Sequence, residues 1–566
     1  MHSSSRFSSW LPRVVAPTIA LLAAAAAGVT TYQPALGATP PDPPTNVAAT
    51  AGIGSATITW TAPASSGTSP LTSYTITSSA GPVDSGIDPA ATSAVFPGLT
   101  NVAQTFTMTA TSNDGTSVAS TASNSVTPLP GGTYNPLTPA RVIDTRNGTG
   151  GVPVAKIGPN GTLTFGMLGQ GGVPATNVSA VILNVTVTDT TAYSDLTVWP
   201  AGTTMPNVSS LNWIPGETIP NQVEVALGSG GAVNFNNVFG ATNLVVDVEG
   251  WVGDKTNSYG KNGLFNSLSP LRILDTRTGN GAPAAKLQPG QTINLQVAGR
   301  GGVPAATDAA AVVMNVTVTS PSWYGHLTVF PTGGAVPNAS NLNFNPGETI
   351  PNRVTVPLGT SGQVSINNGT AGTVDVIADV NGWFTSTTST AGGAAFVGIT
   401  PLRLDDTRTS TTCGAFGQPT TPCPLPPNHE LEEDFNSGIT SLVMNVTATQ
   451  PTAAGYFTVF PTNNNVGSFQ NPPNVSDVNF SKGETIPNST IVALGPTGDG
   501  FFGFLVFNAF GYTDVIMDVD GYYGPTVPAP NATTVAQHRS QTSSSTNTAP
   551  STATLQVSHR AWTTAR

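Results

Sequence analysis

The chain has 566 residues, enough for several domains of about 100–150 residues each. Charged residues make up only 8% of it, against about 25% in a typical soluble protein, and the scarcity of Glu, Lys and Arg argues against a helical enzyme core. The formal net charge of −11 argues against nucleic acid and anionic lipid as partners.

Residues 1–38 are typical of a signal peptide. Arg6 and Arg13 precede the apolar run "TIALLAAAAAGV", and "ALGA" at 35–38 offers small residues for cleavage. An uncleaved membrane anchor is the alternative, but the apolar run is too short to span a bilayer, and no later stretch is long enough either. We therefore expect a secreted protein without a transmembrane anchor, or one held at the cell surface by its own contacts.

Residues 39–128 show the alternation of short antiparallel strands. In "SATITWT", Ile58 and Trp60 share one face, and "QTFTMTATSNDG" repeats the pattern. Together with a proline-rich start and Tyr74, these residues resemble a fibronectin type III domain, which implies a β-sandwich. The tyrosine that marks one corner of that family falls on Gln104 here. In bacteria, such domains are commonly spacers or accessory units of secreted, often polysaccharide-active, proteins.

Residues 134–524 contain three copies of one sequence pattern. "PARVIDTR", "PLRILDTR" and "PLRLDDTR" open the copies, and "DVEGW", "DVNGW" and "DVDGYY" close them. Such long copies are domains rather than solenoid units. Apolar residues alternate with Thr and Asn, which predicts three homologous antiparallel β-sandwich-like domains at 134–254, 265–386 and 396–524. The copies resemble uncharacterised β-domains of secreted actinobacterial proteins.

Two further features belong to the third copy and the end of the chain. Cys413 and Cys423, the only cysteines, flank a Gly/Pro-rich loop and are predicted to form a disulfide. A metal site would need more ligands, and a redox pair is usually spaced C-x-x-C. Residues 525–566 are rich in Ser, Thr and Ala and are predicted to be disordered, with contact to an acidic wall polymer as the alternative.

The phrase "GETIPN" recurs in all three copies. Its glycine follows a strand and supplies the positive φ of a type II turn. Its asparagine shares a strand face with core residues, so we expect a structural role, satisfying backbone groups near the preceding proline, with ligand contact as the alternative. The glycines are Gly216, Gly347 and Gly483, and the asparagines are Asn221, Asn352 and Asn488.

The glutamate of the phrase is expected to be exposed, because it follows the turn glycine. Glu217, Glu348 and Glu484 could contact a ligand, bind calcium or pair with an arginine, the obvious partners being Arg141 and Arg146 and their repeats. An aspartate two residues before an arginine is predicted to form a local pair on one strand face. These pairs are Asp144 with Arg146, Asp275 with Arg277, and Asp406 with Arg408.

Carboxylates near the end of each copy are weak calcium candidates. Asp247, Asp379, Asp518 and Asp520 lie on strands that end before a glycine. Their oxygens could ligate Ca²⁺, but the set lacks the six to eight ligands that this ion takes. Acidic residues before glycine are also ordinary turn chemistry, so neither a metal nor another cofactor is expected.

The sequence favours binding or structure over catalysis. Paired carboxylates could serve a glycosidase, but every candidate occurs three times, and no catalytic triad, zinc or phosphate-loop motif is visible. Repetition suits multivalent binding. Trp199, Trp251 and Trp383 are candidates for stacking on sugar rings, although a half-buried tryptophan is more often part of the core.

We therefore expect a binding or structural protein of the cell envelope. An extracellular polysaccharide or cell-wall polymer is the expected partner, bound through the repeated domains. The alternative is a polysaccharide-active enzyme, such as a glycosidase, or the non-catalytic accessory chain of one.

Overall fold

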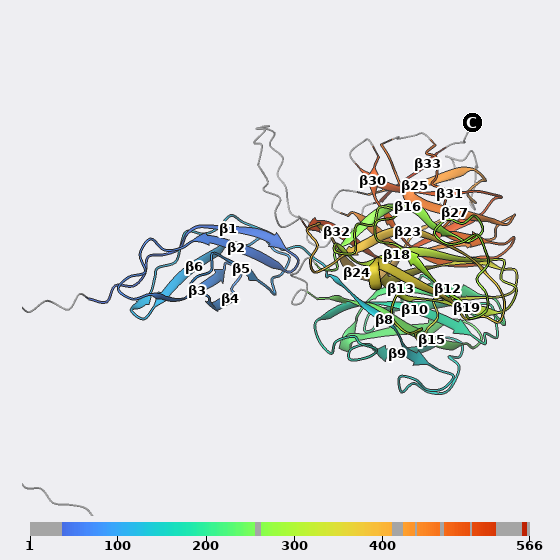
Figure 1. The fold of residues 1–566 in the computed structure, drawn as a ribbon, viewed down its shortest axis with the longest axis horizontal. Helices are drawn as coiled ribbons and strands as arrows, with labels where there is room; N and C mark the ends of the chain where they lie inside the picture. Colours follow the sequence, from blue (N-terminus) through green and yellow to red (C-terminus); the bar gives the residue numbers. More distant parts are fainter. Residues whose placement is uncertain are drawn as a thin grey trace, which may run out of the picture.

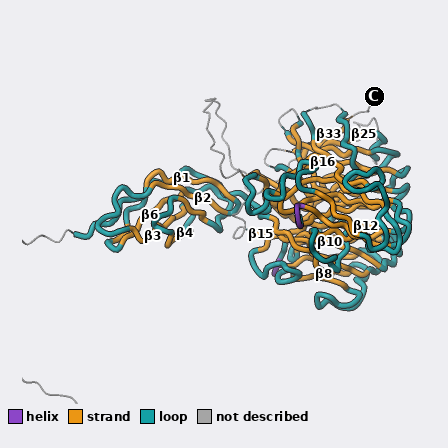
Figure 2. Tube along the Cα trace, in the orientation of Figure 1, coloured by secondary structure: helices purple, strands orange, loops and turns teal. Residues whose placement is uncertain are grey.

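The molecule is built almost entirely from β-strands. The computed structural model describes residues 37–254, 262–409, 423–435, 439–464, 469–497, 501–527 and 557–562. These ranges contain no α-helix, only two short 3-10 turns, η1 (Ser229–Gly231) and η2 (Thr360–Gly362). Strands dominate the trace in Figure 2. The predicted all-β class is confirmed.

Residues 39–128 form the elongated domain at the left of Figure 1. Its two sheets have the orders β1-β2-β5 and β4-β3-β6-β7, a fibronectin type III-like sandwich. Trp60 and Tyr74 are buried between them with ring centroids 5.2 Å apart. Gln104 is buried at the corner position and accepts a hydrogen bond from Ser78 Oγ at 2.5 Å. The strands are β1 (Thr45–Gly52), β2 (Ser55–Thr61), β3 (Leu71–Ser78), β4 (Val83–Ile87), β5 (Ser93–Phe96), β6 (Phe106–Ser112) and β7 (Gly115–Thr116).

The first repeat is an eight-stranded sandwich of two four-stranded sheets. In the first repeat the sheets have the orders β13-β10-β15-β8 and β12-β11-β14-β9. The first strand therefore pairs with the eighth, the second with the seventh, the third with the sixth and the fourth with the fifth. A hairpin wrapped in this way is a jelly roll. The strands are β8 (Tyr134–Asp144), β9 (Gly161–Gly166), β10 (Val178–Thr188), β11 (Ser194–Pro200), β12 (Leu211–Trp213), β13 (Ile219–Ala226), β14 (Ala232–Asn237) and β15 (Asn243–Gly253).

The second and third repeats have the same strand order, but their first strands pair at Phe265 and Ala394, which joins one sheet of each repeat into a single eight-stranded sheet. The third repeat also has a ninth strand of two residues. The second contains β16 (Phe265–Asp275), β17 (Thr292–Gln296), β18 (Ala309–Thr319), β19 (Gly325–Pro331), β20 (Leu342–Phe344), β21 (Thr349–Pro357), β22 (Gln363–Asn368) and β23 (Asp375–Thr385). The third contains β24 (Gly393–Asp406), β25 (His429–Phe435), β26 (Ser441–Thr449), β27 (Gly455–Pro461), β28 (Val478–Phe480), β29 (Thr485–Ala493), β30 (Gly495–Pro496), β31 (Phe502–Asn508) and β32 (Asp514–Val527).

The three repeats pack around a common centre rather than as separate beads. Strand β10 is buried on both faces, since the adjacent residues Leu183 and Asn184 point to opposite faces and are both buried. One face packs inside its own sandwich, and the other faces the neighbouring repeats. Side chains from all three repeats form a plug at one end of this centre. In it Tyr134 lies 4.3 Å from Phe384, and Phe265 lies 4.4 Å from Tyr523, measured between ring centroids.

The fibronectin type III-like domain is joined to the plug end of the ring. Ile53 and Leu129 pack against Leu264 and Ala395, and the backbone of Gly132 bridges to Phe396 in the plug. In Figure 1 this domain accordingly projects from one side of the body formed by the repeats.

Most of residues 525–566, predicted to be disordered, lie outside the described residues, so that prediction is not tested there. Strand β32 extends to Val527, and a further strand, β33 (Val557–Trp562), pairs with β25. Residues 1–36 and Cys413 lie outside the described residues, so the signal peptide and the Cys413–Cys423 disulfide stay predictions. No helix in the described ranges has the length and apolar character needed to cross a membrane.

Candidate functional site

The asparagines of the repeated phrase join the three repeats in a ring. Asn221 Nδ2 donates to the Ser210 carbonyl of its own repeat at 2.7 Å and to Asn445 Oδ1 of the third repeat at 2.8 Å. Its own Oδ1 accepts from the Ser489 N–H at 2.9 Å. The expected structural role therefore includes a contact with another repeat, 224 residues away.

The other two asparagines repeat this arrangement in rotation. Asn352 Nδ2 donates to Asn184 Oδ1 of the first repeat at 2.8 Å, and Asn488 Nδ2 donates to Asn315 Oδ1 of the second at 2.9 Å. The asparagine of the first repeat thus contacts the third repeat, that of the second contacts the first, and that of the third contacts the second. Such head-to-tail contacts close into a ring when the rotation between neighbours fits.

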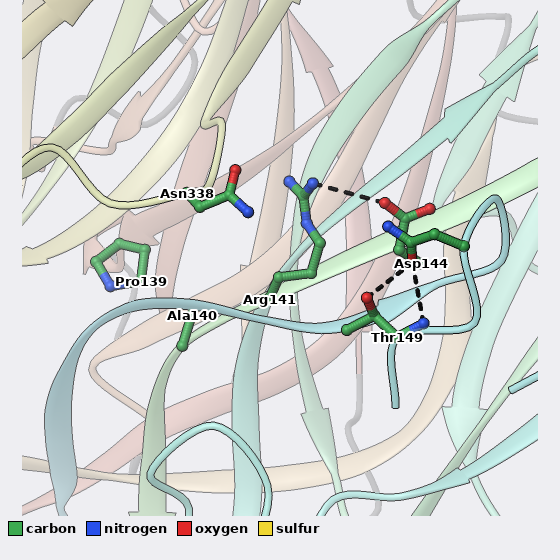
Figure 3. A pocket seen from close by; sticks show the side chains of 7 residues that line it. Pro139, Ala140, Arg141, Asp144, Thr149 and Asn338 are labelled. Carbon is green, nitrogen blue, oxygen red and sulfur yellow. Dashed lines mark hydrogen bonds and ion pairs between the residues drawn. The ribbon is translucent and has the colours of Figure 1, made fainter. Parts of the chain in front are cut away.

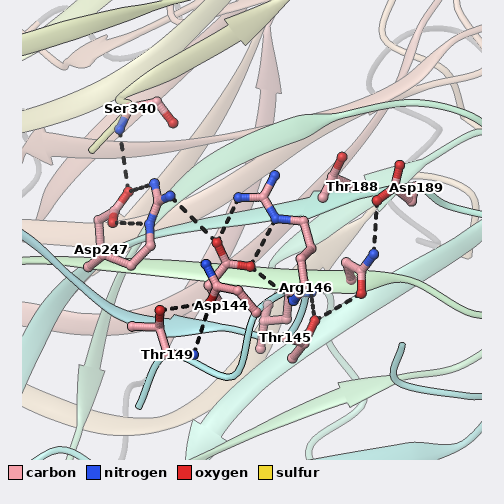
Figure 4. Close-up of polar contacts among 12 residues, drawn as sticks. Asp144, Thr145, Arg146, Thr149, Thr188, Asp189, Asp247 and Ser340 are labelled. Carbon is pink, nitrogen blue, oxygen red and sulfur yellow. Dashed lines mark hydrogen bonds and ion pairs between the residues drawn. The ribbon is translucent and has the colours of Figure 1, made fainter. Parts of the chain in front are cut away.

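Arginine–aspartate pairs lie beside the asparagines. Arg141 donates to both carboxylate oxygens of Asp247, from Nε at 2.8 Å and from Nη2 at 3.0 Å. Asp247 also accepts from the Ser340 N–H of the second repeat at 3.4 Å, as Figure 4 shows. Arg272 with Asp379, and Arg403 with Asp518, repeat the pair.

These contacts correct the calcium hypothesis. The carboxylates of Asp247, Asp379 and Asp518 face guanidinium groups, which supply the positive charge that Ca²⁺ would have brought. Asp520 is buried, and burial raises its pKa well above the usual range, which disfavours the charged form that a metal needs.

The local Asp–Arg pairs are present in all three repeats. Asp144 accepts from Arg146 Nε at 2.9 Å, from Nη2 at 2.7 Å and from the Arg146 backbone N–H at 3.0 Å. These hydrogen bonds hold the pKa of Asp144 below its ordinary value. Asp275 with Arg277 and Asp406 with Arg408 have the same geometry.

Two adjoining cavities lie between the first and second repeats. One, of about 340 Å³, is lined by Arg141, Asp144 and Thr149 of the first repeat and by Asn338 of the second, as Figure 3 shows. The other, of about 300 Å³, shares Arg141 and Asn338 and adds Thr186 and further polar groups of both repeats. Because the arginines here are paired with aspartates, the cavities are polar but nearly neutral in charge.

The three glutamates meet at the opposite end of the ring from the plug. Gly216 has a φ of +82°, and this turn lets Glu217 Oε2 accept from the Ile214 N–H at 2.9 Å. Glu348 and Glu484 make the same contact in their own turns. One carboxylate oxygen of each glutamate lies within 4.8 Å of the others. We call this end, with Glu217, Glu348 and Glu484, the glutamate end.

The glutamates are not exposed, contrary to the expectation, and the alternative of an arginine partner is not observed either. All three are half-buried, and no arginine lies within ion-pair distance of them in the described part of the chain. Burial, and then the charges of Glu348 and Glu484, raise the pKa of Glu217 to about 7. Three carboxylate oxygens could approach a cation, but Ca²⁺ takes six to eight.

Exposed aromatic side chains surround the glutamates. The turn of Glu217 is tied to the β10–β11 loop by the Gly216 N–H, which donates to the Thr190 carbonyl, and Thr191 of that loop is tied in turn to Ala241 of the β14–β15 loop. The other repeats connect the corresponding loops in the same way. These loops carry Tyr193, Phe239, Trp323, Tyr324, Phe510 and Tyr512, which are 43–72% exposed.

The tryptophans named from the sequence do not form this surface. Trp199 and Trp383 are only 5% and 7% exposed, and Trp199 donates through Nε1 to the Thr203 carbonyl. Trp251 is half-buried against the sandwich core. The burial of Trp199 and Trp383 leaves neither ring free to stack on a sugar. The exposed aromatic residues could have been found from the sequence, because they lie in loops next to the repeated turn in the fold.

Comparison with known proteins identifies similarity in part of the chain. No protein-family model matches it, and no curated protein matches it. A solved structure of titin kinase and its flanking domains is 27% identical over 16% of this chain and 18% of that one, with a TM-score of 0.15. The chain thus spans about a fifth of that structure's length.

Two chicken proteins provide longer matches. A segment of tenascin with two fibronectin type III domains is 14% identical over 38% of this chain and 98% of its own, with a TM-score of 0.17. The FN1–FN3 domains of CNTN1 are 14% identical over 62% of this chain and 95% of their own, with a TM-score of 0.16. The fold described above rests on strand order and not on these superpositions.

Proposed function

We propose that this is a secreted, modular binding protein of the cell envelope, which binds an extracellular polysaccharide or cell-wall polymer through the glutamate end. One observation carries the proposal. Among the residues whose burial the structure describes, which end at Gly524, every exposed aromatic side chain lies on the loops beside the glutamate turns. Exposed aromatics scattered over a surface need no explanation, but six gathered at one end favour a binding surface.

The chemistry of these side chains suits a sugar polymer. Tyrosine and tryptophan present a flat apolar ring with a polar edge, so they can cover the apolar face of a sugar while they stay in contact with water. Each repeat carries a different set, Tyr193 with Phe239, Trp323 with Tyr324, and Phe510 with Tyr512. Three weak contacts on one rigid body gain affinity for a polymer through effective concentration.

The architecture supports the same proposal. Along β10, Ala180 lies in the plug and Thr188 contacts Thr218, next to Glu217. Eight residues of strand separate these positions, or roughly 26 Å. The fibronectin type III-like domain, joined at the plug, therefore leaves the glutamate end free to meet a ligand.

A binding experiment with cell-wall fractions and a glycan panel tests the proposal. In the mature full chain, Trp323→Ala with Tyr324→Ala should weaken binding about tenfold, the loss of stacking worth about 1.4 kcal/mol. The control changes Val102 and Val118 to Ala, two exposed side chains of the fibronectin type III-like domain, and should bind as the parent does. Equal binding by all three chains would contradict the proposal.

A second candidate function is a polysaccharide-active enzyme, favoured by the raised pKa of Glu217 among neighbouring carboxylates. A carboxyl group with a pKa of about 7 suits a general acid. Release of reducing sugar by the full chain, abolished in Glu217→Gln, would support catalysis. No release from substrates that the chain binds would leave binding as the function.

A further inference from the structure

The second strand of the third repeat differs in charge from its counterparts. Strand β25 reads "HELEEDF", whereas β9 reads "GTLTFG" and β17 reads "TINLQ", with no charged residue in either. The acidic residues of β25 are nevertheless at most 1% exposed: Glu430, Glu432, Glu433 and Asp434. Buried carboxylates need partners, so something specific covers this strand.

The edge of β25 is covered by the end of the same chain. Strands β9 and β17 are the last strands of their sheets, but β25 has β33 beyond it. The antiparallel register places Arg560 opposite Glu432 and His559 opposite Glu433. The one repeat with an acidic edge strand therefore pairs with a strand that carries basic residues, a match that the other two repeats lack.

The connection between β32 and β33 is long enough to reach another molecule. Strand β32 ends at Val527 and β33 begins at Val557. The residues between them could span at most about 100 Å when extended. An extended segment that adds to an open sheet edge gains main-chain hydrogen bonds wherever it comes from. A neighbouring copy can therefore supply the same strand.

We propose that the edge of β25 is a dedicated binding site for a basic strand, and that the strand Val557–Trp562 of a second copy can occupy it in place of the chain's own. One copy then donates its last strand to the third repeat of the next. Such contacts are head-to-tail and can extend into chains of copies, which suits a protein of the cell envelope. The inference is independent of the ligand proposed for the glutamate end.

The first test asks whether the site binds the strand. In the full chain, His559→Glu with Arg560→Glu reverses the charge of the internal strand and should open the site to a labelled peptide of residues 553–566. The tail holds a second His-Arg pair, so His538→Glu with Arg539→Glu is a matched control. We expect the control, with its own strand in place, to bind the peptide at least about tenfold more weakly.

Hydrogen exchange gives a readout that does not depend on the peptide. The amides of β25 should exchange faster in His559→Glu/Arg560→Glu than in the parent, while those of β9 and β17 stay unchanged. Equal exchange at β25 in both chains, or no peptide binding by the variant, would contradict the proposal that the edge of β25 binds a basic strand.

The second test asks whether copies exchange strands. Isotope-labelled and unlabelled parent chains are mixed at increasing concentration, and the masses of the native complexes are measured. We expect dimers that contain one labelled and one unlabelled chain. The His538→Glu/Arg539→Glu control should form such mixed dimers as well, whereas His559→Glu/Arg560→Glu should not. A parent chain that stays monomeric at every concentration would overturn the exchange between copies.

Discussion

At the scale of single residues, the glutamates of the repeated phrase show how position changes chemistry. Each one closes its own turn by accepting a backbone N–H, as Glu217 does from Ile214. In an isolated turn this carboxylate would lie in water. In the ring it lies beside two others, so burial and like charge both raise its pKa. The group becomes sensitive to pH in the neutral range.

The first prediction concerns the pH dependence of stability. The pKa of Glu217 rises from 4.5 to about 7 on folding, so the folded chain holds an extra proton between these values. Stability contributed by this group is full below pH 4.5 and is lost as the pH rises towards 7. Glu217→Gln should therefore stabilise the protein above pH 7, by about 1–2 kcal/mol after solvent screening, and have little effect below pH 4.5.

Thermal unfolding of both chains at pH 4.5 and pH 8 measures this. Glutamine keeps a side-chain oxygen that can accept the Ile214 N–H, so the two chains differ in charge and not in the hydrogen bond of the turn. A difference in melting temperature that stays constant across the two pH values would contradict the raised pKa.

At the scale of elements, the hairpin that follows each turn is the unit that joins the repeats. Its glycine allows the turn, and the strand that leaves it presents an asparagine on the face that meets the next repeat. Asn221 fastens the hairpin to the Ser210 carbonyl and to Asn445 at once. The same side chain therefore makes one hydrogen bond within its own sandwich and one to the neighbouring sandwich.

The second prediction removes one of these asparagines. Asn221→Ala loses both hydrogen bonds and leaves the Ser489 N–H without its acceptor in a buried site. We expect a loss of about 2–4 kcal/mol in the free energy of unfolding, measured by urea titration. Asn207, which is exposed in the same repeat, supplies the control variant Asn207→Ala, with a change below about 0.5 kcal/mol. Equal effects of both changes would contradict the ring.

At the scale of the whole molecule, the three repeats are similar in fold but not at their centre. The position after the ring asparagine is Gln222 in the first repeat, Arg353 in the second and Ser489 in the third. Arg353 is only 2% exposed, donates from Nε to Gln222 at 2.6 Å and lies 3.6 Å from Glu224 of the first repeat. Its backbone N–H also donates to Asn488 Oδ1 of the third repeat at 3.3 Å, so this residue of the second repeat contacts both of the others.

The third prediction tests this centre with a double-mutant cycle. Arg353→Leu leaves Glu224 buried without its counter-charge and should lower the free energy of unfolding by about 3–5 kcal/mol. Arg353→Leu with Glu224→Leu removes both charges and should recover a large part of that loss. Additive losses in the double variant would contradict a direct pairing of the two residues.

Much of the local structure could be predicted from the residues. Alternation in "TITW" and "LNVTVT" predicted strands, and the φ of +82° at Gly216 follows from the turn chemistry of "PGET". The pairing of Asp144 with Arg146 follows from spacing alone. The half-burial of Glu217 and the strand at Val557–Trp562 could not be predicted in this way.

The all-β class, the fibronectin type III-like domain and the presence of three equivalent repeats could all be inferred from the order of the residues. The reason is that strand alternation, turn geometry and repetition are expressed within a few residues or within one domain. The closure of the repeats into a ring is visible only in the folded molecule. The contacts of Asn221 with Asn445, and of Glu217 with Glu348 and Glu484, join residues more than a hundred positions apart. They depend on the rotation between whole domains, which no local pattern encodes.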